Sequence, residues 1–207
     1  MRSTSLTHWT LFSAPLLLIL AAIWLGFTTE ADVAVFFHDH RAVHPTLKTV
    51  MQLLTDWSNP LFYAGYGLTL LTAYKSNNRE RVRFILILLV VQALVAGLAV
   101  HFLKTFIGRP RPGQGQWFDP LSSRGTQHSL PSGHTTEITG WALPLTLRLE
   151  RIWLTGLFGV FVGLVGFSRI YLGWHHPSDV FFGWMLGSVS GFATVIIANS
   201  TLFTGRS

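Results

Sequence analysis

Cysteine is absent from this 207-residue sequence, and charged side chains are scarce. The lack of cysteine excludes a disulfide framework, a thiolate metal site and a cysteine nucleophile. Charged residues make up only 12% of the chain and hydrophobic residues 49%, whereas a soluble domain has about 25% charged residues. The composition therefore excludes an ordinary soluble domain and predicts an integral membrane protein.

Acidic residues are especially few: nine Asp and Glu stand against 15 Lys and Arg, a net charge of +6. A basic excess can indicate nucleic-acid binding. Here the basic residues form short clusters between apolar runs, a pattern typical of membrane topology signals and of a local anion site. We therefore expect a lipid bilayer and no nucleic acid as partner, and we leave the oligomeric state open. A chain of this length is expected to form a single domain over residues 1–207.

The apolar runs predict an all-α fold with six transmembrane helices. Crossing ~30 Å of hydrocarbon takes about 20 helical residues at ~1.5 Å each. The runs that we interpret as crossings span residues 11–27, 61–74, 84–107, 132–149, 152–172 and 179–203. The first run could be the core of a signal peptide, but no clear small-x-small cleavage site follows it, so we interpret it as a retained helix.

Two segments separate the first two predicted crossings. Residues 28–46 are polar and are expected to be a connection. In residues 47–58 apolar side chains recur at helical spacing, which predicts an amphipathic helix lying in the membrane interface. We expect Asn59-Pro60 to break the chain between this helix and the second crossing.

The orientation follows from the distribution of cations. The dense basic loop 75–83 favours the cytoplasmic face. With six crossings, both termini then lie in the cytoplasm. Three polar segments, residues 104–112, 131–134 and 168–179, all fall at the outer face under this topology.

The first of these segments places Lys104 near a helix end and Arg111 seven residues later, past Gly108 and Pro110. A punctuated turn can direct both cations toward one point. Arginine offers a planar fork of donors for phosphate oxygens, and lysine offers a compact charge. In the alternative interpretation, Lys104 snorkels to the interface and Arg109 and Arg111 mark it.

The second segment, Pro131-Ser132-Gly133-His134, is typical of a helix start. Free backbone N–H groups at such a start favour an anion. His134 on the first turn is placed to exchange a proton with a bound phosphate ester. The alternative is a serine-capped helix with an interfacial histidine.

The third segment combines Arg169, His175 and Asp179. An arginine at the end of an apolar run needs an anionic partner. Asp179 lies four residues after His175, so it can orient that imidazole and leave the other ring nitrogen as a nucleophile. His176 is the rival nucleophile, and Asp179 as a simple helix cap is the structural alternative.

In order and in internal spacing, the three segments match K-x6-R-P, P-S-G-H and S-R-x5-H-x3-D. This pattern resembles the three-part signature of the type-2 phosphatidic acid phosphatase family, which is related to bacterial acid phosphatases and vanadium haloperoxidases. The resemblance covers about a third of the chain, and six crossings with an outward site are similar to the membrane branch of that family. It implies a multi-pass protein of a bacterial inner membrane whose active site faces the periplasm.

The resemblance also implies roles for the residues. His175 would form a phosphohistidine, Asp179 would orient it, and His134 would act as general acid and base. The phosphoryl oxygens would be held by Lys104, Arg111, Ser132, Gly133 and Arg169. No metal or cofactor would be required, because these cations supply the charge stabilisation.

Several residues outside these positions are secondary candidates. Glu137 lies one turn after His134 at membrane depth, and it is expected to face the protein interior, where it tunes His134, lines a head-group pocket or pairs within the first turn. His101, one turn before Lys104, and Ser168, next to Arg169, are further possible supports of the site.

The sequence thus predicts a lipid phosphatase whose substrate carries a phosphate or diphosphate. Undecaprenyl diphosphate, phosphatidylglycerophosphate, phosphatidic acid and lipid A 1-phosphate all present a similar group. Two other hypotheses remain: a phosphotransferase that uses the same site with a lipid acceptor, and a non-catalytic lipid or anion carrier. Polar residues at the helix midplane would favour the carrier, whereas here the charges gather at one face.

Overall fold

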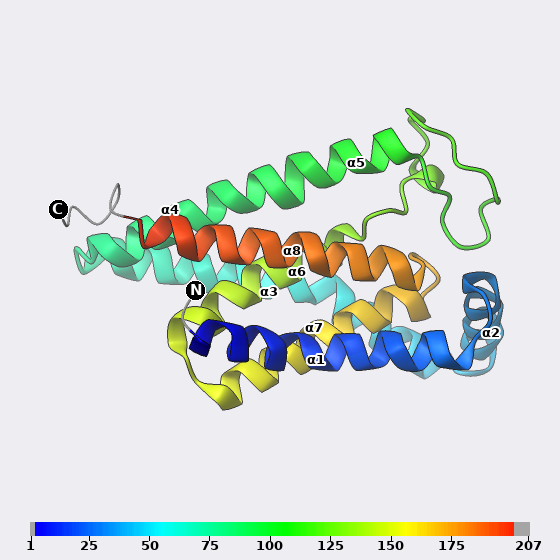
Figure 1. The fold of residues 1–207 in the computed structure, drawn as a ribbon, viewed down its shortest axis with the longest axis horizontal. Helices are drawn as coiled ribbons and strands as arrows, with labels where there is room; N and C mark the ends of the chain where they lie inside the picture. The colour runs from blue at the N-terminus through cyan, green and yellow to red at the C-terminus, as the bar shows by residue number, and fades with distance from the viewer. Residues whose placement is uncertain (1–2, 201–207) are drawn as a thin grey trace.

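The computed structural model describes residues 3–200, and in this part of the chain every regular element is a helix. Figure 1 shows a bundle of long helices with the short helix α2 across one end. The elements are α1 (Ser3–Gly26), α2 (Glu30–Val43), α3 (Pro45–Lys75), α4 (Arg79–Gln92), the π-helix η1 (Ala93–Ala99), α5 (Val100–Ile107), the short 3-10 helix η2 (Gly125–Gln127), α6 (Gly133–Leu149), α7 (Ile152–Tyr171) and α8 (Pro177–Ala198). The all-helical prediction is therefore confirmed for these residues.

Within residues 3–200, four helical segments are long and apolar enough to cross a membrane: Thr4–Gly26, Arg79–Ile107, Ile152–Tyr171 and Pro177–Ala198. The chain is thus a multi-pass membrane protein. Two further helices, α3 with 31 residues and α6 with 17, lie among them in the same bundle. The predicted sixth crossing extends to residue 203, and its last three residues lie outside the described part of the chain.

Residues 28–46 connect the first two predicted crossings, as expected, but most of the connection is helical. Residues 30–43 form α2, whose start is fixed by a capping box in which the Thr29 hydroxyl accepts the Asp32 N–H and the Asp32 carboxylate accepts the Thr29 N–H. Such reciprocal capping satisfies two backbone donors that a helix start otherwise leaves free.

The prediction of a break at Asn59-Pro60 is wrong, because α3 continues through Pro60. The expected interfacial helix and second crossing are therefore one helix. Ser58 and Asn59 are both buried, and Asn59 Nδ2 donates to Glu137 Oε2 at 2.7 Å. Packing against α6 holds the helix through a residue that normally interrupts it.

Helix α6 lies at the centre of the bundle and packs most closely against α8. Glycines on α8 allow this approach. A Cβ at Gly183 would lie 2.6 Å from the Ser132 carbonyl oxygen, and one at Gly187 would lie 2.5 Å from that of Thr136. The starts of α6 and α8 are consequently held side by side.

Helices α4, η1 and α5 form one continuous rod, in which η1 is a π-helical segment of seven residues. Just before it, buried Gln92 bridges to its neighbours: Nε2 donates to the Glu137 carbonyl oxygen and Oε1 accepts from Ser190 Oγ. Beyond η1 the rod diverges from the bundle, as Figure 1 shows for α5. π-Helical segments are frequent at functional sites, and this one directs α5, which carries Lys104.

The two ends of the bundle differ. The long loop after α5, helix α2 and the starts of α6 and α8 gather at one end, whereas the α3–α4 turn lies at the other with the start of α1 and the end of α8 (Figure 1). All three polar segments of the sequence lie at the first end.

Candidate active site

The three polar segments contact one another pairwise. Between the second and third, the Ser132 N–H donates to the Asp179 carbonyl oxygen at 2.9 Å. Between the first and third, Arg111 Nη1 donates to the Trp174 carbonyl oxygen at 3.3 Å. Between the first and second, Lys104 Cε lies 3.7 Å from where a Cβ on Gly133 would stand. Residues far apart in sequence thus form one cluster.

His175 and Asp179 are almost fully buried: 2% of the surface of His175 and 0% of that of Asp179 is exposed. His175 Nδ1 lies 3.6 Å from Asp179 Oδ2, slightly beyond hydrogen-bond distance. Burial lowers the pKa of His175 to about 3, helped by the charges of Lys104 and Arg169 and opposed by Asp179. The ring is therefore neutral at ordinary pH, which is the form that can act as a nucleophile.

Asp179 is the most heavily bonded side chain of the cluster. Its Oδ2 accepts from Ser129 Oγ and, at 2.8 Å, from the His176 backbone N–H. Its Oδ1 accepts from Arg109 Nη1 at 2.6 Å. These contacts fix the carboxylate beside His175, and they also give it the capping position that the alternative interpretation proposed.

His176 has surroundings different from those of His175. Its Nε2 lies 3.3 Å from the Pro110 carbonyl oxygen, and its Nδ1 lies 3.9 Å from Glu30. The ring is half-buried among loop residues. This leaves His175 as the histidine held beside Arg169, whose carbonyl oxygen accepts the His175 N–H at 3.2 Å.

The start of α6 has the predicted form of a serine-capped helix. Buried Ser132 accepts from the Thr135 hydroxyl at 2.9 Å and from its N–H at 3.4 Å. His134, in the first turn, is half-buried, and the charges of Arg169, Lys104 and Arg111 all act on it. Three cations thus act on the His134 imidazole, an arrangement that a bound anion would stabilise.

Each of the three cations, Lys104, Arg111 and Arg169, donates a hydrogen bond to an uncharged oxygen of the protein. Lys104 Nζ donates to the His128 carbonyl oxygen at 2.9 Å. Buried Arg169 donates from Nη1 to Thr55 Oγ1 at 3.1 Å and its guanidinium lies 4.2 Å from the centre of the Trp174 ring. Within residues 3–200, none of the three forms an ion pair within 4 Å, so their charges remain available to an anionic ligand.

The secondary candidates lie in different places. The Glu137 carboxylate accepts from Asn59 and from the Tyr63 hydroxyl, both on α3. Ser168 donates to the Val165 carbonyl oxygen within α7 at 2.6 Å. His101 is exposed, with its ring 6.5 Å from that of His128. None of these contacts leads to His134 or His175.

Arg109 and Glu30 support the Asp179 end of the cluster, and the sequence patterns did not predict this role. Arg109 donates to Asp179, to Ser178 Oγ at 2.7 Å and to Glu30, and the Glu30 carboxylate also accepts the Ser178 N–H at 2.8 Å. The only signal was an acidic residue in the segment after the first crossing and an arginine next to the helix-ending Gly108. Neither pattern indicates its partner.

No group of three or more His, Cys, Asp or Glu side chains within residues 3–200 is arranged to hold a metal ion. The histidines after the first crossing illustrate this. His40 and His44 stack on each other with ring centres 4.0 Å apart, and His40 Nδ1 lies 3.1 Å from the Tyr171 hydroxyl.

Comparison with known proteins identifies the family of this chain. The model of the PAP2 superfamily matches residues 84–201, which is more than half of the chain. Undecaprenyl-diphosphatase BcrC of Bacillus subtilis (strain 168) is 28% identical over 148 residues, covering 70% of this chain and 72% of the relative.

Two further relatives match over somewhat shorter shares. An undecaprenyl-diphosphatase of Sulfolobus acidocaldarius is 33% identical over 125 residues, 58% of this chain and 59% of the relative. A lipid A 1-phosphatase of Rhizobium etli is 32% identical over 139 residues, 65% of this chain and 59% of the relative. The matched segments thus span about three fifths of the length of these two relatives. On these matches, the chain belongs to the PAP2 superfamily of membrane lipid phosphatases.

Proposed function

We propose that this lipid phosphatase removes phosphate from a lipid diphosphate or monophosphate through a phosphohistidine on His175. The observation that carries the proposal is the set of contacts joining the three segments, above all the Ser132 N–H to Asp179 carbonyl bond. It puts the start of α6, with His134, beside the start of α8, with Asp179.

In the first step, His175 Nε2 attacks phosphorus while Asp179 faces Nδ1, 3.6 Å away. The P–N bond forms as the bond from phosphorus to the lipid-side oxygen breaks. His134, protonated, donates its proton to that oxygen, so that the lipid product leaves as an alcohol or a lipid monophosphate.

In the second step, neutral His134 takes a proton from water, and the water oxygen attacks phosphorus. The P–N bond breaks, inorganic phosphate leaves, and His175 returns to its neutral form. Lys104, Arg111 and Arg169 neutralise the phosphoryl oxygens in both steps, with Ser132 and the Gly133 N–H at the helix start. Such prearranged charges do most of the work in phosphoryl transfer, and they supply the stabilisation that a metal provides elsewhere.

For substrate, the names of the relatives support undecaprenyl diphosphate and lipid A 1-phosphate as the first compounds to test. Phosphatidic acid and phosphatidylglycerophosphate carry a comparable group and complete the set. We propose that one domain over residues 1–207 performs the reaction.

We further propose that six helices cross a bacterial inner membrane: α1, α3, the α4–η1–α5 rod, α6, α7 and α8. Both termini then lie in the cytoplasm with the basic α3–α4 turn, and the candidate active site faces the periplasm. The placement of these features at opposite ends of the bundle supports this orientation (Figure 1).

The decisive experiment assays the purified protein in detergent and EDTA with the four lipids, measuring inorganic phosphate. His175→Ala is expected to lose activity by ~10³ or more, while the matched variant His176→Ala keeps most of it. Wild-type enzyme mixed with ³²P-labelled lipid and quenched in alkali should yield labelled protein whose label is lost in acid, as expected for a P–N bond.

Full activity in His175→Ala would refute the mechanism. If the ³²P label is found on a second lipid and not in inorganic phosphate, the protein is a phosphotransferase. Tight lipid binding without turnover in every assay would favour the carrier.

A further inference from the structure

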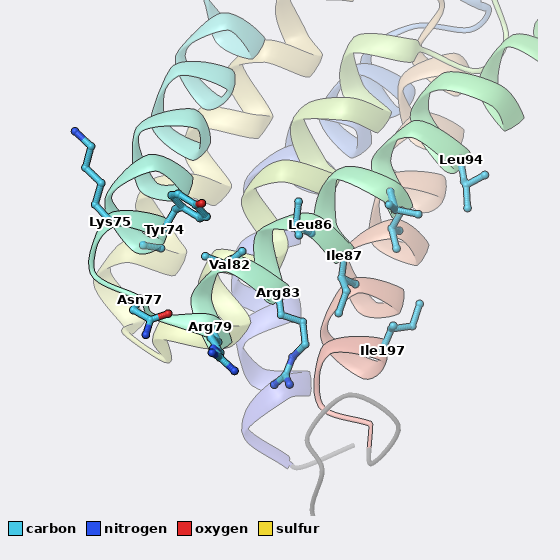
Figure 2. Close-up of a pocket in the computed structure, with 13 residues that line it drawn as sticks. Tyr74, Lys75, Asn77, Arg79, Val82, Arg83, Leu86, Ile87, Leu94 and Ile197 are labelled. Atoms are coloured by element: carbon cyan, nitrogen blue, oxygen red, sulfur yellow. The ribbon is translucent and has the colours of Figure 1, made fainter.

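A groove lies at the end of the bundle opposite the candidate active site. It has a volume of about 960 Å³ and is formed by the end of α3, by α4 and by the last turns of α8. Figure 2 shows Arg79 and Arg83 near each other at one end of it, Lys75 pointing away from them, and Leu94 at the other end. No step of the proposed reaction uses this groove.

The charged end of the groove is entirely cationic. Three of its 13 lining residues are Lys75, Arg79 and Arg83, and none is acidic. Within residues 3–200, none of these three side chains forms an ion pair within 4 Å. Arg79 and Arg83 lie four residues apart on α4 and repel each other, so an anionic ligand between them would be stabilised.

A neighbouring groove gives an internal contrast. It lies between α3, α4, α6 and α7 and is lined by two cations, Arg81 and Arg148. The chain supplies partners for Arg148: its Nη2 donates to Glu80 Oε1 at 2.7 Å, and its guanidinium lies 4.4 Å from the centre of the Phe84 ring. No cation that lines the first groove has an ion-pair partner within residues 3–200.

The rest of the first groove is apolar. Leu86, Ile87, Val90 and Leu94 follow the cations along α4 and η1, and Leu86, Val90 and Leu94 are each about half exposed. From Leu86 to Leu94 the helix rises ~12 Å at ~1.5 Å per residue. One leaflet of a ~30 Å hydrocarbon core is about 15 Å deep, so the apolar part matches one leaflet.

The turn between α3 and α4 fixes the cations relative to this apolar strip. Asn78 caps α4 by accepting the Arg81 N–H at 3.0 Å, and Asn77 has a left-handed φ of +53°. Asparagine tolerates this conformation better than most residues. The turn thus fixes the start of α4, with Arg79 and Arg83, relative to the end of α3.

We propose that this groove binds an anionic phospholipid, with its phosphate between Arg79 and Arg83 and an acyl chain along α4 toward Leu94. The same cations also serve as the topology signal. Topology depends on the number of charges on that side of the membrane, whereas binding depends on their position in the groove. The proposal is independent of the proposed reaction, which takes place at the other end of the bundle.

The test measures retained lipid by native mass spectrometry after purification in micelles with equal amounts of phosphatidylglycerol and phosphatidylethanolamine. Wild-type protein is expected to retain phosphatidylglycerol preferentially. Arg83→Gln should weaken this retention about fivefold, and Arg79→Gln with Arg83→Gln more strongly, since each basic residue near a membrane surface contributes a factor of this size. Val90→Trp, which fills the apolar strip, should also weaken it.

The matched control is Arg151→Gln, an exposed arginine at the same end of the molecule that does not line the groove. It removes the same charge and is expected to keep full retention. Phosphate release from a lipid phosphate serves as the folding check for every variant. Equal losses in Arg83→Gln and Arg151→Gln, or equal retention of both lipids by the wild type, would overturn the proposal.

Discussion

Arg109 links the Asp179 carboxylate to a distant part of the chain. It donates to Asp179 Oδ1 and to Glu30, and its own side chain is 15% exposed. Removing one member of a buried ion pair leaves the other charge uncompensated. We therefore regard Arg109 as a positioning residue that acts through Asp179 on His175.

Replacing Arg109 by Met is expected to lower kcat by about 100-fold, because a misplacement of ~1 Å in a catalytic group has an effect of this size. KM should change little, since Arg109 makes no contact with the phosphate in the proposed mechanism. Steady-state kinetics on a lipid phosphate measures both constants.

Arg109→Lys serves as the conservative control and is expected to restore part of kcat, because lysine keeps one donor for Asp179. A variant that raises KM and leaves kcat intact would place Arg109 among the phosphate-binding residues instead.

The pKa of His175 gives a second prediction at this scale. Its pKa is lowered from the ordinary value of about 6.5 to about 3 by burial. The unfolded chain therefore binds this proton more readily than the folded chain, so stability falls as the pH drops from about 6.5 toward 3. His175→Asn removes the titrating group and with it this contribution to the pH dependence of stability.

Melting temperatures of the wild type and of His175→Asn in detergent, measured from pH 7 to 4.5, test the sign. The wild type is expected to lose more stability than the variant over this range. Parallel curves for the two proteins would show that this proton does not couple to folding.

At the scale of elements, the close contact between α6 and α8 holds together the two helix starts that carry His134 and Asp179. A Cβ at Gly187 would lie 2.5 Å from the Thr136 carbonyl oxygen and 2.6 Å from Thr139 Cβ. A methyl group there must push the two helices apart. The starts of α6 and α8, with their hydrogen bond from Ser132 to Asp179, would separate with them.

Gly187→Ala is therefore expected to destabilise the protein by ~1–3 kcal/mol, the usual effect of overpacking, and to reduce activity. Unfolding by denaturant in mixed micelles measures the change. Gly65→Ala is the matched control, because a Cβ at Gly65 in α3 meets nothing within 4 Å and alanine is the better helix former. Equal effects of the two substitutions would contradict the role of close α6–α8 packing.

Helix α3 shows what local patterns miss at this scale. A proline after asparagine is a sound signal for a break, yet the helix passes through it because Thr55, Ser58 and Asn59 are buried against other helices. Contacts formed only in the folded bundle override the local preference. In α2 the missed signal was local instead: Thr29 and Asp32, three residues apart, form a capping box at the start of a segment with little apolar periodicity.

At the scale of the molecule, the lack of cysteine makes the orientation testable. Single cysteines at Ser76, in the α3–α4 turn, and at Ser123, in the loop before α6, lie at opposite ends of the bundle. In intact cells a membrane-impermeant maleimide is expected to label Ser123→Cys, and to label Ser76→Cys only after permeabilisation. The cysteine-free wild type is the blank. The reverse pattern would invert the proposed topology.

The sequence by itself determined the class of protein and the chemistry-bearing residues of its three segments. These follow from local properties: apolar runs long enough for a bilayer, and motif spacings that set which side chains share a helix end. Only the tertiary structure decided how those residues are supported. Glu30 meets Ser178 across 148 positions, and Glu137 turns to α3 instead of to His134. Such pairings depend on how whole helices rotate and pack against one another, and that choice is made by the summed contacts of the bundle, which no single stretch of sequence contains.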